Sequence, residues 1–479
     1  MGSGGISGQQ KLSKGALVGL VVGAMIGSGI FSIPGTLSRS TGGLGAMIAW
    51  TIAAIGMLML AMVFKTLSLR RADLDTGVYS YARAGFGRYL GFNSALGYWV
   101  GCCLADVVCL VHIKATLGKF FPAFGDGTTV PAIIGATVLL WCFHFVVLHD
   151  VKKAVALNTI ATVIKIIPIV IFIVVAIAGF NADIFALNFW GGDAPTFGNV
   201  SEQVRSSMLV TVFVFVGLEG ASVFSRYASG REHIGYATVL GAVSVLCLVV
   251  LVSMLSYGVL LRPELAALPS PAMGSVMASI VGPWRWAFIS VGLLISILGN
   301  YLAWSLLATE VLHAAAKTKT MPSFLAMEND RGAPAASLWL TNIVIQIFLL
   351  ISWFAEHAFS LALQMTSSMT LVPYLLVAAF GLKLAWTGES YEADGRERRL
   401  NGVQSAIAVV FALGMLYAGG PKFLLLSSIL YACGTALFLL AQREHQGPAF
   451  TRAEWLVFLV LVVLAVVALG ALYIGHIKL

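Results

Sequence analysis

The sequence predicts an all-α protein that crosses a membrane many times and has two interrupted helices near its centre. Two observations support the membrane fold. Of the 479 residues, 59% are hydrophobic and only 10% are charged, and the mean hydropathy is +0.92, a composition typical of polytopic membrane proteins. The apolar residues also fall into long runs. A third observation, glycine clusters inside two of these runs, predicts the interruptions.

Thirteen apolar runs approach or exceed the roughly 20 residues that a helix needs to cross about 30 Å of hydrocarbon. They lie at 15–35, 43–65, 87–117, 129–148, 154–180, 206–226, 236–261, 281–314, 336–355, 358–385, 402–418, 421–441 and 454–475. We divide the chain into a cytoplasmic tail (1–14), a core of two repeats (15–180 and 206–385, together 15–385) and accessory helices (386–479). We expect no cleavable signal peptide, because residues 1–13 are polar and rich in glycine.

The lysines and arginines predict the orientation of the chain. If the N-terminus is cytoplasmic, most of the 29 basic residues lie in cytoplasmic loops, and the opposite side carries about a third as many. The net charge of +8 therefore follows from membrane topology, and we expect no nucleic-acid partner. We expect a multi-pass protein in a bacterial inner membrane, surrounded by the lipid bilayer. The sequence leaves the oligomeric state open, with a homodimer as one option.

The reactive side chains do not suggest catalysis. The six cysteines fall inside predicted spans and have no metal-ligand spacing, so we interpret them as packing residues. The eight histidines are scattered, and no phosphate-binding loop or nucleophile elbow is present. We expect no metal, no cofactor and no enzymatic activity. A channel is also disfavoured, because no repeated pore motif or ring of charges is visible.

The first apolar run contains a helix-breaking segment. Residues 27–34 read Gly-Ser-Gly-Ile-Phe-Ser-Ile-Pro, although glycine and proline weaken a membrane helix. A broken helix leaves backbone N–H groups without partners, and hydrocarbon tolerates this only where those groups face a cavity or a ligand. The freed donors form a positive pole that can hold a carboxylate. This predicts a binding site near the middle of the bilayer.

The sixth apolar run repeats this feature. Residues 213–222 read Phe-Val-Phe-Val-Gly-Leu-Glu-Gly-Ala-Ser, with a buried acid, Glu219, beside the glycines. Single glycines in membrane helices often serve close packing. Two glycine-rich interruptions five spans apart are better explained by two inverted halves.

Several motifs resemble those of a known family. They are GSGIF in the first run, ALGYW in the third, FVGLEGASV in the sixth and YLAWSLLATE in the eighth. Together they are similar to the amino acid-polyamine-organocation superfamily, and within it to the basic amino acid/polyamine antiporters of the arginine/ornithine group. The resemblance covers nearly the whole chain. It implies a five-plus-five inverted repeat with discontinuous first and sixth helices, followed by accessory helices.

The resemblance also implies how the first break binds an amino acid. The backbone amides around Gly27, Ser28 and Gly29, with Ile26 just before them, would receive the substrate carboxylate. The helix break itself leads to the same expectation, because its free amides are donors and a zwitterion needs hydrogen-bond donors at one pole and acceptors at the other.

The resemblance also implies which residues bind the α-ammonium group and the side chain of the substrate. Carbonyl groups near Met25, Phe213 and Val216 would accept the α-ammonium group. Trp304 falls where related exchangers place an aromatic ring against the substrate side chain, although in isolation it would be interpreted as a packing residue. Phe213 departs from the pattern, because the related arginine/agmatine exchanger has tryptophan there. This weakens the expectation of stacking on a guanidinium group.

Asp106 lies at mid-depth in the third span, where a bare carboxylate is costly unless it is paired or hydrated. Related exchangers often carry asparagine there, facing the substrate. An acid at this position could recognise a cationic side chain. The alternative is an internal ion pair with Lys114 or Lys165.

Two further ionisable residues suggest roles in gating or coupling. Glu219 matches a glutamate that is widespread in the family, and it either anchors the broken helix or takes part in gating. Lys165 is a lone cation in the fifth span. In sodium-independent relatives a lysine here stands near the position that a sodium ion fills in sodium-coupled ones. It would therefore brace span 1 against span 8, or else carry a proton.

The sequence thus predicts a secondary active antiporter that exchanges L-arginine for L-ornithine by alternating access. The alternatives are exchange of a basic amino acid for its amine, such as lysine/cadaverine, histidine/histamine or arginine/agmatine, and a proton-coupled amino acid permease.

Overall fold

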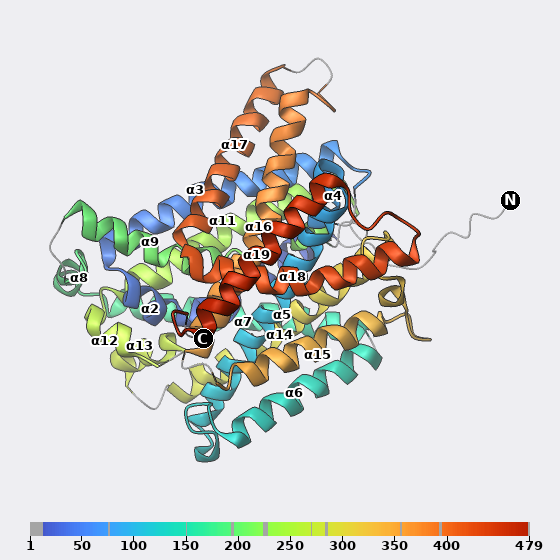
Figure 1. The fold of residues 1–479 in the computed structure, drawn as a ribbon. Helices are drawn as coiled ribbons and strands as arrows, with labels where there is room; N and C mark the ends of the chain where they lie inside the picture. Colours follow the sequence, from blue (N-terminus) through green and yellow to red (C-terminus); the bar gives the residue numbers. More distant parts are fainter. Residues whose placement is uncertain are drawn as a thin grey trace.

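The computed structural model describes residues 13–477 except 75–76, 150, 193–195, 224–228, 270, 283–285, 355–356 and 392–394. Helices joined by loops make up the described chain (Figure 1). They are α1 (Lys14–Met25), α2 (Ser28–Ser40), α3 (Gly43–Arg70), α4 (Val78–Phe86), α5 (Arg88–Gly118), α6 (Val130–His149), α7 (Val151–Ala178), α8 (Ala182–Asn188), α9 (Phe197–Phe213), α10 (Gly220–Val223), α11 (Arg231–Ser256), α12 (Arg262–Ala267), α13 (Ala272–Val281), α14 (Trp286–Lys317), α15 (Ala335–Ile351), α16 (Ala358–Thr387), α17 (Gly395–Ala418), α18 (Gly420–Glu444) and α19 (Arg452–Tyr473). The predicted all-α class is confirmed.

Within the described residues, ten helical segments are long and apolar enough to cross a membrane, and a bent pair raises the number to eleven. The bent pair joins the second half of α7 to α8 at an angle of 101°. The chain is therefore a polytopic membrane protein, as predicted. The prediction of about thirteen spans also counts α15, which has 17 residues, and the divided pair α9 and α10. That higher number stays a prediction.

α5 is the central helix of the molecule. It packs against α14, α16 and α15, and its apolar stretch is entirely buried. Gly97 allows α16 and α18 to approach it closely. The hydroxyl of Tyr431 donates to the carbonyl oxygen of Met369 at 3.2 Å, and a β-carbon at Gly97 would lie 2.1 Å from that hydroxyl. Any larger residue at position 97 would push these helices apart.

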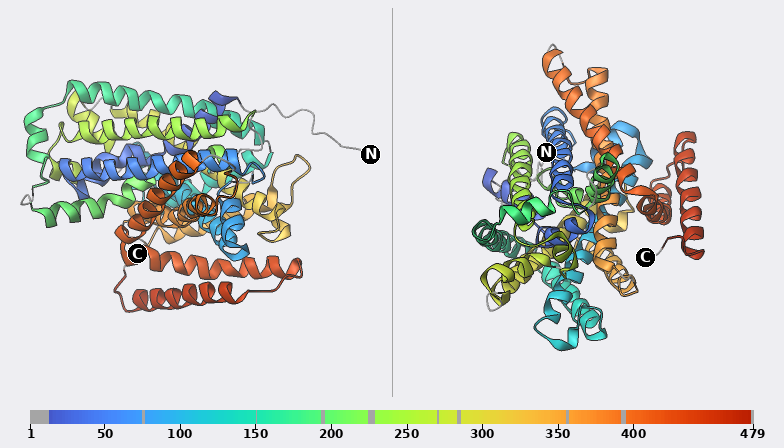
Figure 2. Two further views of the ribbon diagram at one scale, coloured as in Figure 1. Left: turned by 90° about the horizontal axis from the view of Figure 1, so that it is seen from above. Right: turned by 90° about the vertical axis from the view of Figure 1, so that its left-hand side faces the viewer.

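The last two helices form a hairpin at the edge of the molecule (Figure 2). α18 and α19 pack against each other, and only 11% of the apolar stretch of α19 is buried. Its exposed side chains include Leu456, Val460 and Val463. An apolar surface of this kind is suited to contact with lipid or with a second membrane helix.

Basic side chains join several helices at one end of the bundle. Arg70 forms an ion pair with Glu397 at 2.6 Å, which ties α3 to α17. Arg83 of α4 donates to the carbonyl oxygen of Thr318, just beyond α14, at 2.5 Å. Lys383 of α16 donates to the carbonyl oxygen of Gly85 at 2.7 Å. This is the end that the distribution of basic residues predicts to be cytoplasmic.

A second polar network holds the opposite end. The Arg262 guanidinium donates to the carbonyl oxygens of Ser38, at 2.9 Å, and Gly191. The Arg262 amide donates to Asn188 Oδ1 at 2.7 Å. These bonds fix the end of α2 to α8 and α12, so the second half of the first broken helix is tied to the short helices beside it.

Candidate functional site

The first break separates α1 from α2. α1 ends at Met25 and α2 begins at Ser28, and between them Gly27 is extended, with φ −116° and ψ −160°. No side chain caps α2, so the amides of its first turn lack partners within the helix. Ile26 and Gly27 are buried. The positive end of a helix thus lies inside the protein, where it can stabilise an anion.

The second break separates α9 from α10. α9 ends at Phe213, α10 begins at Gly220, and residues 214–219 form consecutive turns. Gly217 has a φ of +106°, a conformation that residues with a side chain rarely adopt. The Val216 amide donates to the Phe213 carbonyl oxygen at 3.2 Å, and this oxygen keeps a second lone pair for another donor.

The two breaks touch each other. A β-carbon added to Gly217 would lie 2.9 Å from Cβ of Ala24 and 3.2 Å from the Met25 amide nitrogen. A β-carbon added to Gly29 would lie 2.7 Å from the Phe213 ring. The structure therefore brings together backbone segments that lie almost 200 residues apart in sequence, with the Phe213 ring over Gly29.

Glu219 holds the second break in shape. Its Oε1 accepts the Gly217 amide at 3.2 Å, and its Oε2 accepts a hydrogen bond from the Tyr374 hydroxyl of α16. The Glu219 carbonyl oxygen accepts the amides of Ser222 and Val223 at 2.7 and 3.0 Å. The interpretations of Glu219 as an anchor of the broken helix and as a part of gating both stay predictions.

Asp106 is fully buried on α5. Neither of its carboxylate oxygens has a hydrogen-bond partner in the part of the chain that the structure describes. Among the same residues, neither Lys114 nor Lys165 forms the ion pair with Asp106 that was the alternative interpretation. A buried carboxylate without a donor is unfavourable. Its oxygens are therefore available to a cation or a proton.

Lys165 contacts the first half of the broken helix. Its Nζ, fully buried on α7, donates to the carbonyl oxygen of Gly23 on α1, one turn before the break. The same stretch of α7 also packs tightly on α14, because a β-carbon at Gly299 would lie 2.2 Å from Cβ of Ala161. Lys165 thus lies where α1, α7 and α14 converge. Its roles as a brace or as a proton carrier stay predictions.

The other predicted residues lie on the same elements. Ser28 opens α2, and Val216 lies in the second break, where it is buried. Trp304 is 3% exposed and lies on α14, which packs extensively against α5. These positions are consistent with a shared site.

Asn300 is a site residue that the sequence analysis did not single out. It lies on α14, one turn before Trp304. A β-carbon at Gly27 would meet its Nδ2 at 2.3 Å and its Oδ1 at 2.9 Å, so the side-chain amide lies directly on the first break. Its Nδ2 donates to Cys109 Sγ at 3.3 Å. The available signal was a polar residue within an apolar run, four residues before Trp304.

His112 is a second unforeseen polar contact. Its Nε2 lies 2.6 Å from Ser32 Oγ, which joins α5 to α2 beyond the break. Its ring stacks on Phe359 with a centroid distance of 4.2 Å. This pair fixes the second half of the broken helix against the helix that carries Asp106.

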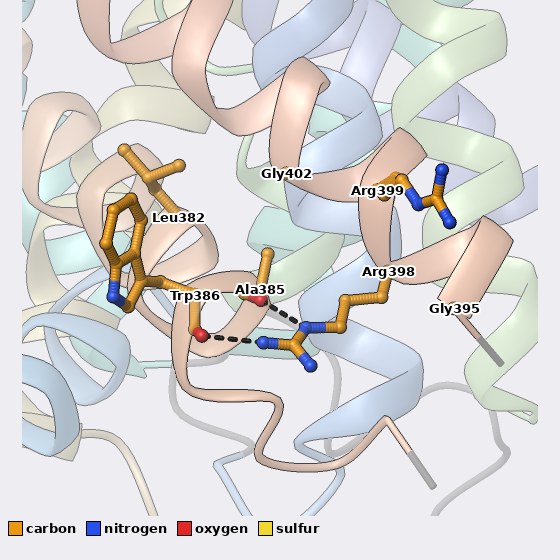
Figure 3. Close-up of a pocket in the computed structure, with 7 residues that line it drawn as sticks. All are labelled: Leu382, Ala385, Trp386, Gly395, Arg398, Arg399 and Gly402. Carbon is orange, nitrogen blue, oxygen red and sulfur yellow. Dashed lines mark hydrogen bonds between the residues drawn. The ribbon is translucent and has the colours of Figure 1, made fainter. Parts of the chain in front are cut away.

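A separate surface cavity lies away from these residues. It has a volume of about 480 Å³ and is lined by Leu382, Ala385, Trp386, Gly395, Arg398, Arg399 and Gly402 (Figure 3). There the Arg398 guanidinium donates to the carbonyl oxygens of Ala385 and Trp386 at 2.6 and 2.7 Å. Arg398 therefore caps the end of α16. None of the predicted site residues lines this cavity.

No group of three or more His, Cys, Asp and Glu side chains that could hold a metal ion occurs in the described residues. The arrangement is instead one of buried backbone donors, backbone acceptors and a carboxylate. An all-helical membrane protein whose two interrupted helices meet in its interior is a secondary transporter of the broken-helix class.

The chain belongs to the amino acid permease family, whose profile matches residues 12–477. It is 49% identical to the arginine/ornithine antiporter of Pseudomonas aeruginosa, covering 98% of this chain and 99% of that protein. It is 37% identical to the arginine/agmatine antiporter of Chlamydia caviae, covering 96% and 97% of the two chains. This membership confirms the family resemblance and the prediction that the protein is a transporter and not an enzyme.

A solved structure shares the fold. The crystal structure of MhsT in complex with L-phenylalanine matches 86% of this chain and 100% of its own, with a TM-score of 0.61 and 15% sequence identity. At this identity the similarity concerns the fold alone.

Proposed function

We propose that the protein exchanges L-arginine for L-ornithine across a bacterial inner membrane by alternating access. The 49% identity with the Pseudomonas antiporter over nearly the full length supports this substrate pair. The structural observation that carries the proposal is the buried contact between the two breaks, next to the helix of the unpartnered Asp106. A zwitterion with a cationic tail has a carboxylate for the amides of the first break, an ammonium group for the carbonyl oxygens of both breaks, and a positive charge for Asp106.

The carboxylate of the substrate would bind at the start of α2. The amides of Ser28 and Gly29 lie in the uncapped first turn of α2 and would be the main donors. The amides of Ile26 and Gly27 donate to the carbonyl oxygens of Val22 and Met25 at 2.8 and 2.9 Å, so they would contribute only by sharing their hydrogen with the carboxylate. Because this end is buried, hydrogen bonds from backbone amides and the helix dipole act there with little screening by water.

The α-ammonium group would bind to carbonyl oxygens of both breaks. The Met25 oxygen accepts the Gly27 amide at 2.9 Å, and the Phe213 oxygen accepts the Val216 amide at 3.2 Å. Each carbonyl oxygen can accept a second hydrogen bond. The carbonyl oxygen of Val216 would complete the set.

The cationic tail would extend toward Asp106, with Trp304 packed against its methylene groups. Arginine and ornithine both carry a positive tail, so one carboxylate serves both. Each substrate also has a net charge of +1, so one-for-one exchange moves no net charge. This makes the proposed cycle electroneutral.

We further infer that the transport core consists of two inverted repeats with the broken helices as the first and sixth spans. On this topology α15 and the α9–α10 pair each cross the membrane, which gives thirteen spans, with α17 to α19 as accessory helices. The N-terminus would be cytoplasmic, because the basic cluster around Arg70 and Arg83 lies at the end where α3 finishes and α4 follows.

Counterflow in proteoliposomes tests the proposal. Vesicles loaded with L-ornithine should accumulate labelled L-arginine, and empty vesicles should not. Loading with agmatine, cadaverine or histamine tests amino acid/amine exchange, the second candidate, which the 37% identical arginine/agmatine antiporter favours. Uptake into empty vesicles driven by a pH gradient would instead indicate a proton-coupled permease. Failure of ornithine to drive arginine uptake would contradict the proposed pair.

A further inference from the structure

The side-chain amide of Asn300 lies at the first break with one of its two polar atoms unpartnered. Nδ2 donates to Cys109 Sγ. Oδ1 has no hydrogen-bond partner among the described residues, and Asn300 is only 2% exposed. A buried amide oxygen without a donor is unfavourable by an amount comparable to a lost hydrogen bond. It therefore marks a position where a donor is missing.

We infer that Asn300 Oδ1 is a side-chain acceptor for the α-ammonium group of the substrate. This inference rests on the function proposed above. The unpartnered atom lies against Gly27, two residues from the Met25 carbonyl oxygen that is proposed to bind the same group. An ammonium group has only donors, and a carboxylate has only acceptors. Because the atom that lacks a partner is an acceptor, the ammonium group is the matching pole.

The position of Asn300 also separates its side-chain amide from the residues proposed to bind the substrate tail. Cys109, its partner on α5, lies one helical turn from Asp106, and Trp304 lies one turn further along α14. The amide is therefore positioned at the α-carbon end, while Asp106 and Trp304 serve the tail. Replacing this amide should change how strongly the protein distinguishes substrates with an α-amino group from those without one.

The test compares three ligands that differ by one group each. L-arginine has both poles, agmatine lacks the carboxylate, and desamino-arginine lacks the α-amino group. Dissociation constants are measured by calorimetry on the purified full-length protein and on Asn300→Leu. We expect Asn300→Leu to weaken L-arginine and agmatine by about 10- to 100-fold, the effect of losing a hydrogen bond to a charged group. Desamino-arginine should bind the variant as it binds the parent.

Two control variants keep the comparison interpretable. Asn300→Asp retains an acceptor, so its ratio of L-arginine affinity to desamino-arginine affinity should equal or exceed that of the parent. This variant also tests the inference if Asn300→Leu does not fold. Cys109→Ala removes the partner of Nδ2 and leaves Oδ1 in place, so it should change the affinity for all three ligands by the same factor. Thermal melting of each variant establishes that it is folded.

Three results would overturn the inference. An equal loss for all three ligands in Asn300→Leu would show that the amide only supports packing at Gly27. A loss that spares agmatine would show that it binds the carboxylate. A lower affinity ratio in Asn300→Asp than in the parent would show that Oδ1 is not an acceptor for the ammonium group.

The proposed function is tested separately, by the parent alone. If the parent binds neither L-arginine nor L-ornithine, that function fails. The same comparison is then made with the α-amino acid that the parent does exchange and its desamino analogue, because the α-ammonium group is common to all of them.

Discussion

Replacing Gly27 by alanine should disable the proposed carboxylate site without unfolding the protein. The added β-carbon would lie 2.3 Å from Nδ2 and 2.8 Å from Cγ of Asn300, whereas carbon and nitrogen atoms pack at about 3.5 Å. Either the Asn300 side-chain amide turns away from the break or the break shifts by roughly 1 Å, and overpacking of this kind costs about 1–3 kcal/mol where the side chain cannot move aside. A misplacement of about 1 Å can cost an enzyme about 100-fold in rate, and we expect a loss of similar size in transport by Gly27→Ala. Valine at position 27 should abolish uptake.

The assay is ornithine-driven uptake of labelled L-arginine into proteoliposomes, with the melting temperature of each variant as the measure of folding. Gly19→Ala is the matched control, because it lies in α1 and nothing lies within 4 Å of its added β-carbon. It should transport normally and gain about 0.5–1 kcal/mol in stability. Uptake by Gly27→Ala with the KM and maximal rate of the parent would refute the placement of the site at this break.

The remaining predictions concern coupling and the cytoplasmic loops. Transport should continue when choline replaces sodium, and strict sodium dependence would contradict this. Transport should stall in Lys165→Ala, because the side chain that ties α7 to the Gly23 carbonyl oxygen is then missing. If exchange by Lys165→Ala persists but loses the pH dependence of the parent, Lys165 is a proton carrier. The hydrogen bond from Lys317 lowers the pKa of Glu328, so its stabilisation is present above the ordinary carboxyl pKa and is lost as the pH falls through the lowered value. Glu328→Gln should therefore lower the melting temperature at pH 7, and this difference from the parent should shrink as the pH falls below the ordinary carboxyl pKa. Because the pair is half-exposed, the effect should stay below about 1 kcal/mol.

The two breaks could be predicted from sequence because their signal is local. Glycines inside an otherwise apolar run interrupt a helix whatever other helices pack around it. The breaks within 27–34 and 213–222 can therefore be recognised from the sequence alone. Their contact with each other did not follow from local signals. It depends on Gly217 lying against Ala24. Only the family resemblance indicated that the two broken helices belong together.

Contacts between distant helices explain what sequence reasoning missed. Asn300 and Gly27 are 273 positions apart, and His112 and Ser32 are 80 apart, so no local pattern predicts either contact. The pairing of Asp106 with Lys114 was considered because both are polar residues of one helix. Eight residues correspond to a rise of about 12 Å and a rotation of about 80°. The two side chains therefore point in different directions, and the carboxylate stays without that partner.

The charge of Asp106 in the empty protein can explain why the transporter would exchange one substrate for another instead of releasing a substrate and returning empty. With no substrate, a charged Asp106 would stay buried without a donor while the empty protein changes orientation, which is unfavourable by several kcal/mol. With arginine or ornithine bound, the cationic tail neutralises it. In the proposed cycle the loaded protein should therefore change orientation much faster than the empty one, and this difference would make exchange obligatory.

Asp106→Asn should weaken this coupling. The variant carries no charge when empty, so its empty form should return more readily, while its affinity for arginine and ornithine falls by about 1–3 kcal/mol and neutral amino acids are affected less. The measurement is efflux of labelled arginine from vesicles into buffer with and without external ornithine. Efflux without ornithine should rise relative to exchange in Asp106→Asn. An unchanged ratio together with unchanged affinity would remove Asp106 from the substrate site, and efflux by the parent that increases at acid pH would show that a proton can replace the substrate on this carboxylate.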